Sequence, residues 1–296
     1  MRVLITGGTG LLGKALIDNS NNQIEIIATY VGKYNMQDND QVKYLQLDVR
    51  DKSGYINLFK NIKPDITVHT AGIGSPDFAE KNRELVWDIN LNGTQNILDM
   101  CEKFDSKFIF ISSNGIYDGQ NAPYSEEDKA EPVNYYGEVK LKGEEITKKA
   151  KIPFVIVRPI LMYGWHYPFE RSNIVTQSIL KLQNQEIIHA YDDVYIKPLL
   201  NYSCATAIWK TINENNFGVF NIAGADRVSI HQLVTKAAEI FNLNKALVIP
   251  VQQGYFNELA KRPCDTSFKT DKMEKILGVK PLTLEDGLIT MRETQQ

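Results

Sequence analysis

The chain of 296 residues is predicted to adopt an α/β fold, with a doubly wound parallel sheet followed by a smaller C-terminal lobe. Short apolar runs alternate with helical patterns through the first half, which is typical of parallel strands joined by crossover helices. The first apolar run leads directly into Thr6-Gly-Gly-Thr-Gly-Leu-Leu-Gly13, a glycine-rich turn of the kind that separates a strand from a helix in such folds.

Six strands are expected in the first half. Each is a short apolar run that ends where a polar or glycine-bearing turn begins. Functional residues should therefore lie on loops at the carboxyl edge of the sheet, where open α/β folds bind ligands. The strands are expected at 3–6, 24–29, 43–47, 66–70, 107–112 and 153–158, and the helices near 10–19, 52–62, 82–104 and 134–151.

The composition is that of an ordinary soluble globular protein, with 43% hydrophobic and 23% charged residues. The net charge of −3 argues against a nucleic-acid-binding surface, which normally carries a basic excess. Three widely spaced cysteines and four scattered histidines predict neither a disulfide framework nor a metal site. No apolar stretch reaches the length of a membrane span, and the chain enters a strand at once without a signal peptide. We therefore expect a cytoplasmic protein.

The turn after the first strand predicts a dinucleotide site. Gly7, Gly10 and Gly13 are spaced three apart between a strand and a helix, so that backbone amides can approach a pyrophosphate at the helix N-terminus. A glycine-rich turn alone is a weak signal, and the repeated βα units that follow it strengthen this one. With Leu11 and Leu12, the glycines form the expected phosphate-binding turn of a Rossmann-like sheet.

The end of the second strand bears on which dinucleotide binds. It reads Ile26-Ile-Ala-Thr-Tyr-Val-Gly-Lys33 and lacks the acid that would accept the 2′-hydroxyl of NAD. Such an acid would repel the 2′-phosphate of NADP. Its absence and the nearby Lys33 favour NADP (NADPH), with NAD as the alternative. Lys33 is equally well explained as a solvated loop residue.

The rhythm of the sequence changes after residue 159. The segment 160–200 reads as irregular and rich in aromatic residues, and is followed by a helix near 202–214, a strand near 217–222, a helix near 229–242 and a strand near 246–250. We expect residues 1–160, with about 199–224, to form the dinucleotide-binding domain. Residues 161–198 and 225–296 are expected to form a substrate-binding lobe, and the strand near 217–222 to return to the main sheet.

Tyr136 and Lys140 are candidate catalytic residues. Four residues apart on a predicted helix, their side chains share one face. An ammonium group about 4–6 Å from a phenol favours the phenolate and lowers the phenol pKa from its usual value of about 10. The pair could then exchange a proton with a carbonyl or an alcohol. Alone the pair is weak evidence, since a solvated helix face has the same appearance.

An ordered set of motifs resembles the extended branch of the short-chain dehydrogenase/reductase superfamily over nearly the whole chain. Besides the glycine turn and the Tyr136–Lys140 helix, the set comprises Thr70-Ala-Gly72, Asn90-Leu-Asn-Gly-Thr94, Ser112-Ser-Asn-Gly115 and Arg158-Pro-Ile160. Within this branch the chain is most similar to the dTDP-4-dehydrorhamnose reductases and to the regulatory β-subunits of methionine adenosyltransferase.

The resemblance implies roles for individual residues. Ser113 would join Tyr136 and Lys140 in catalysis, and Asp48 corresponds to the acid that contacts the adenine, although a helix N-cap role is an alternative. The implied cofactor-binding residues are Gly7, Gly10, Leu11, Leu12, Gly13, Lys33, Asp48, Val49, Ala71, Gly72, Asn90, Ser112, Tyr136, Lys140 and Arg158.

The implied substrate residues are Ser113, Asn114, Trp165, His166 and Arg262. Arg262, in Lys261-Arg-Pro-Cys-Asp265, resembles the arginine that grips a nucleotide-sugar diphosphate, and a surface salt bridge is its alternative. For Trp165 and His166, substrate contact and ordinary packing are equally compatible with the sequence. The chain departs from the reductase pattern at Ser112-Ser113-Asn114, where Ser-Thr-Asp is usual, and in the segment 165–171.

The resemblance implies an NAD(P)H-dependent reductase of a 4-keto-6-deoxy nucleotide sugar, with Tyr136 as the proton donor to the carbonyl. The alternatives are a nucleotide-sugar 4-epimerase with tightly bound NAD and a non-catalytic, cofactor-binding regulatory subunit. A homodimer paired through helices such as 82–104 and 134–151 is also expected. The sequence leaves the sugar and the stereochemistry of the product open.

Overall fold

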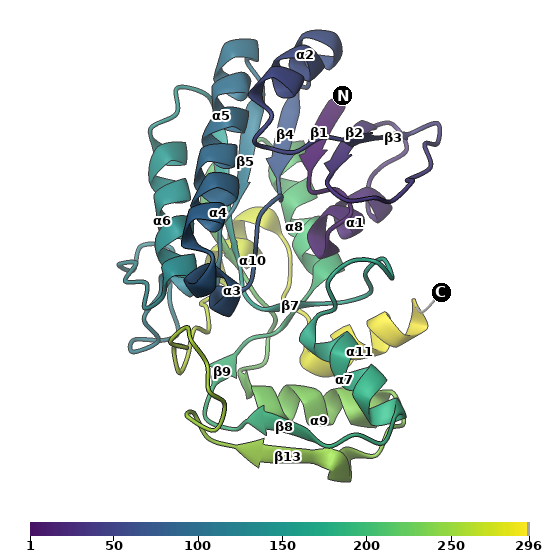
Figure 1. The fold of residues 1–296 in the computed structure, drawn as a ribbon, viewed down its shortest axis with the longest axis vertical. Coiled ribbons are helices and arrows are strands. Elements are labelled where there is room, and N and C mark those ends of the chain that lie inside the picture. Colours follow the sequence, from purple (N-terminus) through teal and green to yellow (C-terminus); the bar gives the residue numbers. More distant parts are fainter. Residues whose placement is uncertain (295–296) are drawn as a thin grey trace.

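A computed structural model describes residues 1–294, which form a seven-stranded parallel sheet above a smaller lobe (Figure 1). The strand order is β11-β6-β5-β4-β1-β2-β3, so the order reverses on either side of β1. All six strands expected in the first half are confirmed, and β11 pairs with β6 as expected. The strands are β1 (Arg2–Thr6), β2 (Glu25–Tyr30), β3 (Val42–Gln46), β4 (Ile66–His69), β5 (Lys107–Ile111), β6 (Phe154–Pro159) and β11 (Gly218–Ile222).

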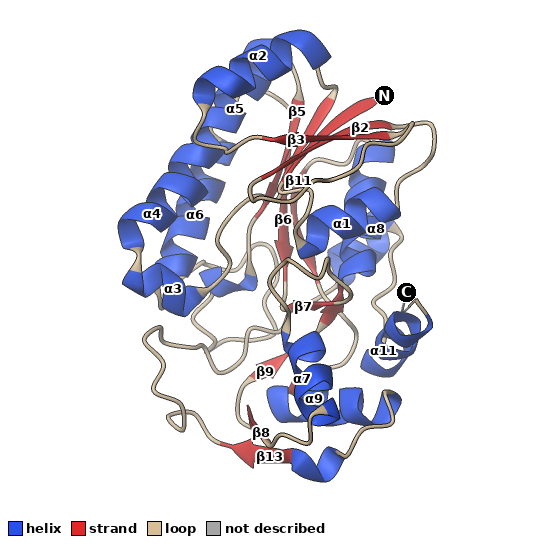
Figure 2. Ribbon diagram, turned by 45° about the vertical axis from the view of Figure 1, so that its right-hand side comes forward, coloured by secondary structure: helices blue, strands red, loops and turns tan. Residues whose placement is uncertain are grey.

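Helices cover both faces of the sheet, as a doubly wound fold requires (Figure 2). One layer contains α1 (Leu11–Asp18) and α8 (Asn201–Asn213), which contact each other, and the opposite layer contains α2 (Lys52–Ile62), α5 (Gly93–Phe104) and α6 (Tyr135–Lys148). In β1, Val3 and Ile5 belong to one apolar core, while Leu4 belongs to the other. Burial on both faces explains why this strand reads as a continuous apolar run.

The helix expected at 82–104 is interrupted. It consists of α4 (Arg83–Trp87), a π-helical turn (Asp88–Asn92) and α5, and it is preceded by a short unpredicted helix, α3 (Pro76–Lys81). A π-turn adds a residue to the helical repeat and so redirects a side chain, which hydrophobic periodicity does not reveal.

The segment 160–200 is not irregular, contrary to expectation. It contains β7 (Met162–Tyr163), α7 (Ile174–Gln183), β8 (Ile188–Tyr191), β9 (Tyr195–Ile196) and β10 (Leu199–Leu200). Strands of two to four residues are too short to show a period. A signal for α7 did exist, because Asn173 and Thr176 form a capping box at its start.

The smaller lobe has its own apolar core between a strand pair and two helices. In it, β8 pairs with β13 (Val248–Val251), and α7 packs against α9 (Ile230–Ile240). Of the other helices and strands, β12 (Val228–Ser229) pairs with β9, and α11 (Leu284–Glu293) packs against α9. Helix α10 (Asp271–Leu277) instead packs against β11 and α8 of the main sheet. Since α8 and β11 lie with the main sheet, the chain passes from the sheet to the lobe and back. The exact division into two domains stays a prediction.

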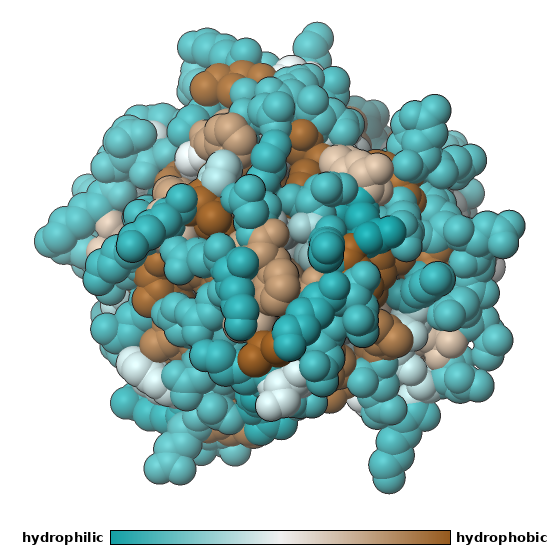
Figure 3. Space-filling model, turned by 90° about the horizontal axis from the view of Figure 1, so that it is seen from above, coloured by the Kyte–Doolittle hydropathy of each residue, from teal (hydrophilic) through white to brown (hydrophobic). Residues whose placement is uncertain are grey.

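The end of the molecule that carries the amino ends of the strands is largely hydrophilic. Seen from above, apolar side chains there are scattered among polar ones (Figure 3). Among residues 1–294, no helix has both the length and the apolar character needed to cross a membrane.

Candidate active site

The glycine-rich turn lies at the carboxyl end of β1 and leads into α1. Gly7 has a φ of +70°, a left-handed conformation, and a Cβ at Gly13 would collide with the carbonyl oxygen of Gly7. Gly10 is the N-cap of α1 and supplies no side-chain cap. The first-turn amides, those of Leu11 and Leu12 included, are therefore available to an anion. The Leu12 side chain is buried in the core.

A cavity of about 170 Å³ opens beside this turn, at the carboxyl ends of β1 to β4. Its position on either side of β1 is the switch point at which doubly wound sheets bind ligands. Its lining includes five of the predicted cofactor residues, Gly7, Asp48, Val49, Ala71 and Gly72. Lys33 lies outside this lining, exposed in the loop between β2 and β3.

Asp48 is held at the cavity by Arg50. The guanidinium donates hydrogen bonds to both carboxylate oxygens, at 3.0 Å and 2.7 Å. The hydrogen bond from Arg50 keeps the pKa of Asp48 below its usual value, so the carboxylate is charged at neutral pH. The N-cap of α2 is Asp51, whose side chain accepts from the amide of Gly54, so the alternative role for Asp48 as a helix cap is wrong.

Asn90, in the π-turn, braces the loop after β4. Its side chain accepts from the amide of Ile73 at 2.7 Å and donates to the carbonyl of Ile73 at 3.0 Å. Behind it, His69 is buried between Thr6 and Thr94, with ring nitrogens 2.7 Å and 3.0 Å from their hydroxyls. Burial lowers the pKa of His69 to about 3, so this histidine is a neutral structural link.

Three predicted catalytic residues converge beyond Gly72. A Cβ at Gly72 would lie 3.7 Å from Lys140 Nζ, and a Cβ at Gly115 would lie 3.3 Å from the Tyr136 ring and 3.4 Å from Ser113 Oγ. Helix α6 can approach the Ser113 loop this closely because residue 137 is a glycine. Any other residue would carry a Cβ that collides with the carbonyl oxygen of Gly115. The geometry therefore brings a hydroxyl, a phenol and an ammonium to the end of the cavity.

Lys140 does not lower the pKa of Tyr136 here, contrary to the sequence-based expectation. Burial raises the pKa of Tyr136 above its usual value, while hydrogen bonding to Ser113 and the charge of Arg171 oppose the rise. The ammonium of Lys140 instead donates to the carbonyl of Ile111 at 2.9 Å. Burial lowers the pKa of Lys140 to about 8.

Arg158 and Ser112, both predicted to bind the cofactor, serve another purpose. Arg158 Nε and Nη2 donate to the two carboxylate oxygens of Glu144 at 2.7 Å and 2.6 Å, and Ser112 Oγ donates to the same carboxylate at 2.6 Å. Arg158 also donates to the hydroxyl of Tyr117. Because Arg158 is 3% exposed and Glu144 is fully buried, the cluster supports the site from below rather than contacting a ligand.

The predicted substrate residues are mostly engaged within the protein. Asn114 lies beside Ser113 and donates to Thr266 Oγ1 at 2.7 Å, which ties the catalytic loop to the C-terminal segment. Trp165 donates from its indole nitrogen to the carbonyl of Met291, and both ring nitrogens of His166 lie within 3.2 Å of Tyr167 and Thr176 oxygens. Trp165 and His166 are therefore packing residues, which corrects their assignment to the substrate.

Arg262 is paired with acids. Its guanidinium donates to Asp77 Oδ2 at 2.7 Å and to Glu258 Oε1 at 3.2 Å, and Asp77 also accepts from the amide of Ala260. The salt bridge considered as the alternative is thus present, and it fastens the C-terminal segment to α3. Thr266 and Asp77 lie 152 and 185 positions along the chain from the residues that they hold, so sequence spacing does not reveal them. Glu144 lies only 14 positions from Arg158, but no spacing rule pairs a helix residue with a residue of the strand that follows.

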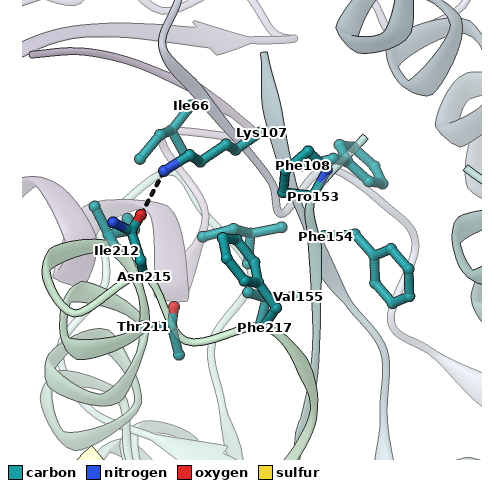
Figure 4. Close-up of a pocket in the computed structure, with 11 residues that line it drawn as sticks. Ile66, Lys107, Phe108, Pro153, Phe154, Val155, Thr211, Ile212, Asn215 and Phe217 are labelled. Carbon is teal, nitrogen blue, oxygen red and sulfur yellow. Dashed lines mark hydrogen bonds between the residues drawn. The ribbon is translucent and has the colours of Figure 1, made fainter. Parts of the chain in front are cut away.

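A second hollow lies at the opposite, amino edge of the sheet (Figure 4). It is lined mainly by apolar side chains at the starts of β4, β5 and β6 and after α8, and Lys107 Nζ donates to Asn215 across it. Since the predicted catalytic groups lie at the other edge, this hollow is not part of the candidate site. Among the described residues, no cluster of His, Cys, Asp or Glu could hold a metal ion.

Known proteins are similar to this chain over almost its whole length. The family model described as the RmlD substrate binding domain matches residues 1–296. Methionine adenosyltransferase 2 subunit beta from Rattus norvegicus is 25% identical over 280 residues, which are 93% of this chain and 82% of that protein. The dTDP-4-dehydrorhamnose reductase of Aggregatibacter actinomycetemcomitans is 23% identical over 308 residues, with 98% of each covered.

Among solved structures, the dTDP-4-dehydrorhamnose reductase from Bacillus anthracis, in complex with NADP, superimposes with a TM-score of 0.87. The two are 25% identical, and 99% of each chain is covered. The seven-stranded Rossmann-like fold is therefore shared over the whole chain.

Replacing Glu144 with Gln should lower the free energy of unfolding by about 3–5 kcal/mol, because it leaves the buried charge of Arg158 without its partner. Chemical denaturation at pH 7 measures this. The exposed Glu145→Gln on the same helix is the control and should change stability by less than about 0.5 kcal/mol.

The decrease in the free energy of unfolding caused by Glu144→Gln should also depend on pH. Although burial raises the pKa of Glu144, hydrogen bonds and charge from Arg158 bring it below 4.5. The stabilisation is therefore complete above pH 4.5 and disappears as the pH falls through the folded-state pKa. If the wild type and Glu144→Gln differed in stability as much at pH 3 as at pH 7, the lowered pKa of Glu144 would be contradicted.

Lys140 should make stability rise with pH between about 8 and 10.5, because the folded pKa of about 8 lies below the ordinary value of 10.5. Relative to Lys140→Met, the wild type should gain about 3 kcal/mol across this range. Denaturation at a series of pH values measures the difference, with the exposed Lys142→Met as the control. A parallel pH profile for wild type and Lys140→Met would refute the depressed pKa.

Proposed function

The chain belongs to the RmlD substrate binding domain family, and from this membership and the site geometry we propose that it reduces a 4-keto-6-deoxy nucleotide sugar with NADPH. It is an NAD(P)-dependent oxidoreductase of the extended short-chain dehydrogenase/reductase type. The observation that carries the proposal is the convergence of Ser113, Tyr136 and Lys140 at the end of the dinucleotide cavity.

The described residues fit a dinucleotide. The turn at Gly7–Gly13 offers free backbone amides to the pyrophosphate, and the cavity beside Asp48 and Val49 suits the adenosine. No acid ends β2, and Lys33 is exposed nearby, which supports NADPH over NADH. Ala71, Gly72 and Lys140 would lie along the remainder of the cofactor, and Asn90 would hold their loop in place.

NADPH, when bound, supplies the hydride that a carbonyl carbon accepts. Tyr136 would give its phenolic proton to the carbonyl oxygen, and burial keeps that phenol protonated at neutral pH. The Ser113 hydroxyl, adjacent to the phenol, would hydrogen-bond the same oxygen and fix its position. Lys140, whose ammonium already donates to the Ile111 carbonyl, would use its remaining N–H groups to hold ribose hydroxyls of the cofactor.

The substrate's diphosphate is assigned to Arg262. In the described structure its guanidinium is neutralised by Asp77 and Glu258, at 24% exposure. A diphosphate offers the same planar guanidinium a bidentate partner of higher charge, so substrate binding would exchange one anion for another. The sugar and the product stereochemistry are left unassigned.

Tyr136→Phe should lower kcat for NADPH oxidation with 4-keto-6-deoxy nucleotide sugars by about 10²–10⁴-fold, the usual contribution of a positioned acid. NADPH affinity, measured by nucleotide fluorescence, should change less than about twofold because the ring is retained. Tyr135→Phe, whose hydroxyl only donates to the Arg83 carbonyl, is the matched control. Equal turnover by Tyr136→Phe and wild type would exclude Tyr136 as the proton donor.

A regulatory, non-catalytic role is the second candidate, because methionine adenosyltransferase 2 subunit beta is similar along 93% of this chain. The presence of all three catalytic groups supports the reductase instead. Turnover with any member of a panel of 4-keto nucleotide sugars separates the two. Full NADPH binding without turnover across the panel would favour the regulatory role.

A homodimer is also part of the proposal. Large apolar side chains of α3 and α4, Phe78, Leu85 and Trp87, are 37–40% exposed beside α6. These side chains would be covered if two copies paired through the helices that carry the catalytic tyrosine. A cytoplasmic location stays a prediction.

A further inference from the structure

The segment Gly164–Asn173 between β7 and α7 forms a closed loop, which we call the strap. Its two ends are joined because Asn173 Nδ2 donates to the Gly164 carbonyl at 2.7 Å. Gly164 has a φ of +145°, and a Cβ there would collide with the Asn201 side chain. Compact loops with adjoining ends are frequently functional. In Figure 1 the strap, coloured teal, extends from β7 to the purple α1.

The strap is fastened at its tip by aromatic stacking. The Phe169 ring stacks on Tyr34, in the loop after β2, with centroids 3.8 Å apart, and the Tyr34 hydroxyl donates to the Phe169 carbonyl. The Tyr167 ring also stacks on Phe169, and its centroid lies 5.2 Å from Lys14 Nζ of α1. The strap therefore bridges α1 and the loop that carries Lys33.

Next to this stack, Glu170 reaches the glycine-rich turn. Its carboxylate accepts a hydrogen bond from the hydroxyl of Thr9 at 2.5 Å, and Thr9 itself is buried. Thr9 directly precedes Gly10, the N-cap of α1. The next strap residue, Arg171, is close enough to Tyr136 for its charge to influence the phenol. The strap therefore has one residue, Glu170, at the phosphate-binding turn and the next, Arg171, near the catalytic tyrosine.

We propose that the strap closes the dinucleotide site of the free protein, with the Glu170 carboxylate standing in for a phosphate at the glycine-rich turn. The inference rests on the proposed NADPH site. A pyrophosphate and a carboxylate repel each other, so the presence of Glu170 at this turn weakens the binding of a pyrophosphate there. The cofactor enters when Glu170 releases Thr9, and the strap then leaves the turn.

Removing the charge of Glu170 tests the competition. Glu170→Gln keeps the shape and an oxygen that can accept from Thr9, but it no longer repels a phosphate. Its Kd for NADPH, measured by nucleotide fluorescence, should fall at least about fivefold, the effect of one charge contact in a water-like dielectric. Added salt should shrink the gain. Glu186→Gln, the same change at an exposed position after α7, is the control and should bind as the wild type does.

Hydrogen exchange follows the strap itself. In the cofactor-free protein, Phe169→Ala should speed amide exchange across residues 165–172 by about two- to tenfold, because the stack on Tyr34 is lost. In the wild type, NADPH should likewise raise exchange at Glu170, whose amide donates to the Tyr167 carbonyl.

Two results would overturn the strap while leaving the proposed function intact. One is NADPH binding with equal affinity by Glu170→Gln and Glu186→Gln. The other is slower exchange of the strap once NADPH is bound, which would make it a clamp on the cofactor rather than its competitor. If neither wild type nor variants bind NADPH, the proposed function itself fails, and the strap inference fails with it.

Discussion

The buried ion pair between Arg158 and Glu144 is the interaction on which the site depends. It joins β6 to α6, and the hydroxyl of Ser112, directly after β5, donates to the same carboxylate. Helix α6 carries Tyr136 and Lys140 one to two turns from Glu144, so the pair fixes the height of both groups above the sheet. Two fully desolvated charges are costly unless every hydrogen bond is satisfied, and here both carboxylate oxygens are occupied.

The sheet and the cofactor turn could be predicted from the sequence because their signals are local. A strand that is buried on both faces, as β1 is, can be recognised from its five residues alone because they form a nearly continuous apolar run. The spacing of Gly7, Gly10 and Gly13 is likewise set by the turn itself. The convergence of Ser113 with Tyr136 was implied by the resemblance to the extended short-chain dehydrogenase/reductases, and it agrees with the rule that parallel strands place their following loops at one edge of the sheet.

The partners of the site residues could not be predicted, because sequence spacing carries no information about them. Arg262 meets Asp77 across 185 positions, and Glu170 meets Thr9 across 161. The Tyr136 pKa is raised because the phenol is buried, and only the packed structure specifies that burial. The family resemblance likewise implies that Arg158 binds the cofactor, although its charge is paired with Glu144 inside the protein.

The return of β11 to the sheet has a consequence for dissecting the protein. A fragment that stops near residue 160 would contain the whole glycine turn and the catalytic helix, yet β6 would become an edge strand. Val155 and Val157, now covered, would border a row of free amides and carbonyls, which is a template for pairing with other chains. We expect such a fragment to aggregate rather than fold independently. The catalytic half therefore needs β11, which follows it by about sixty positions.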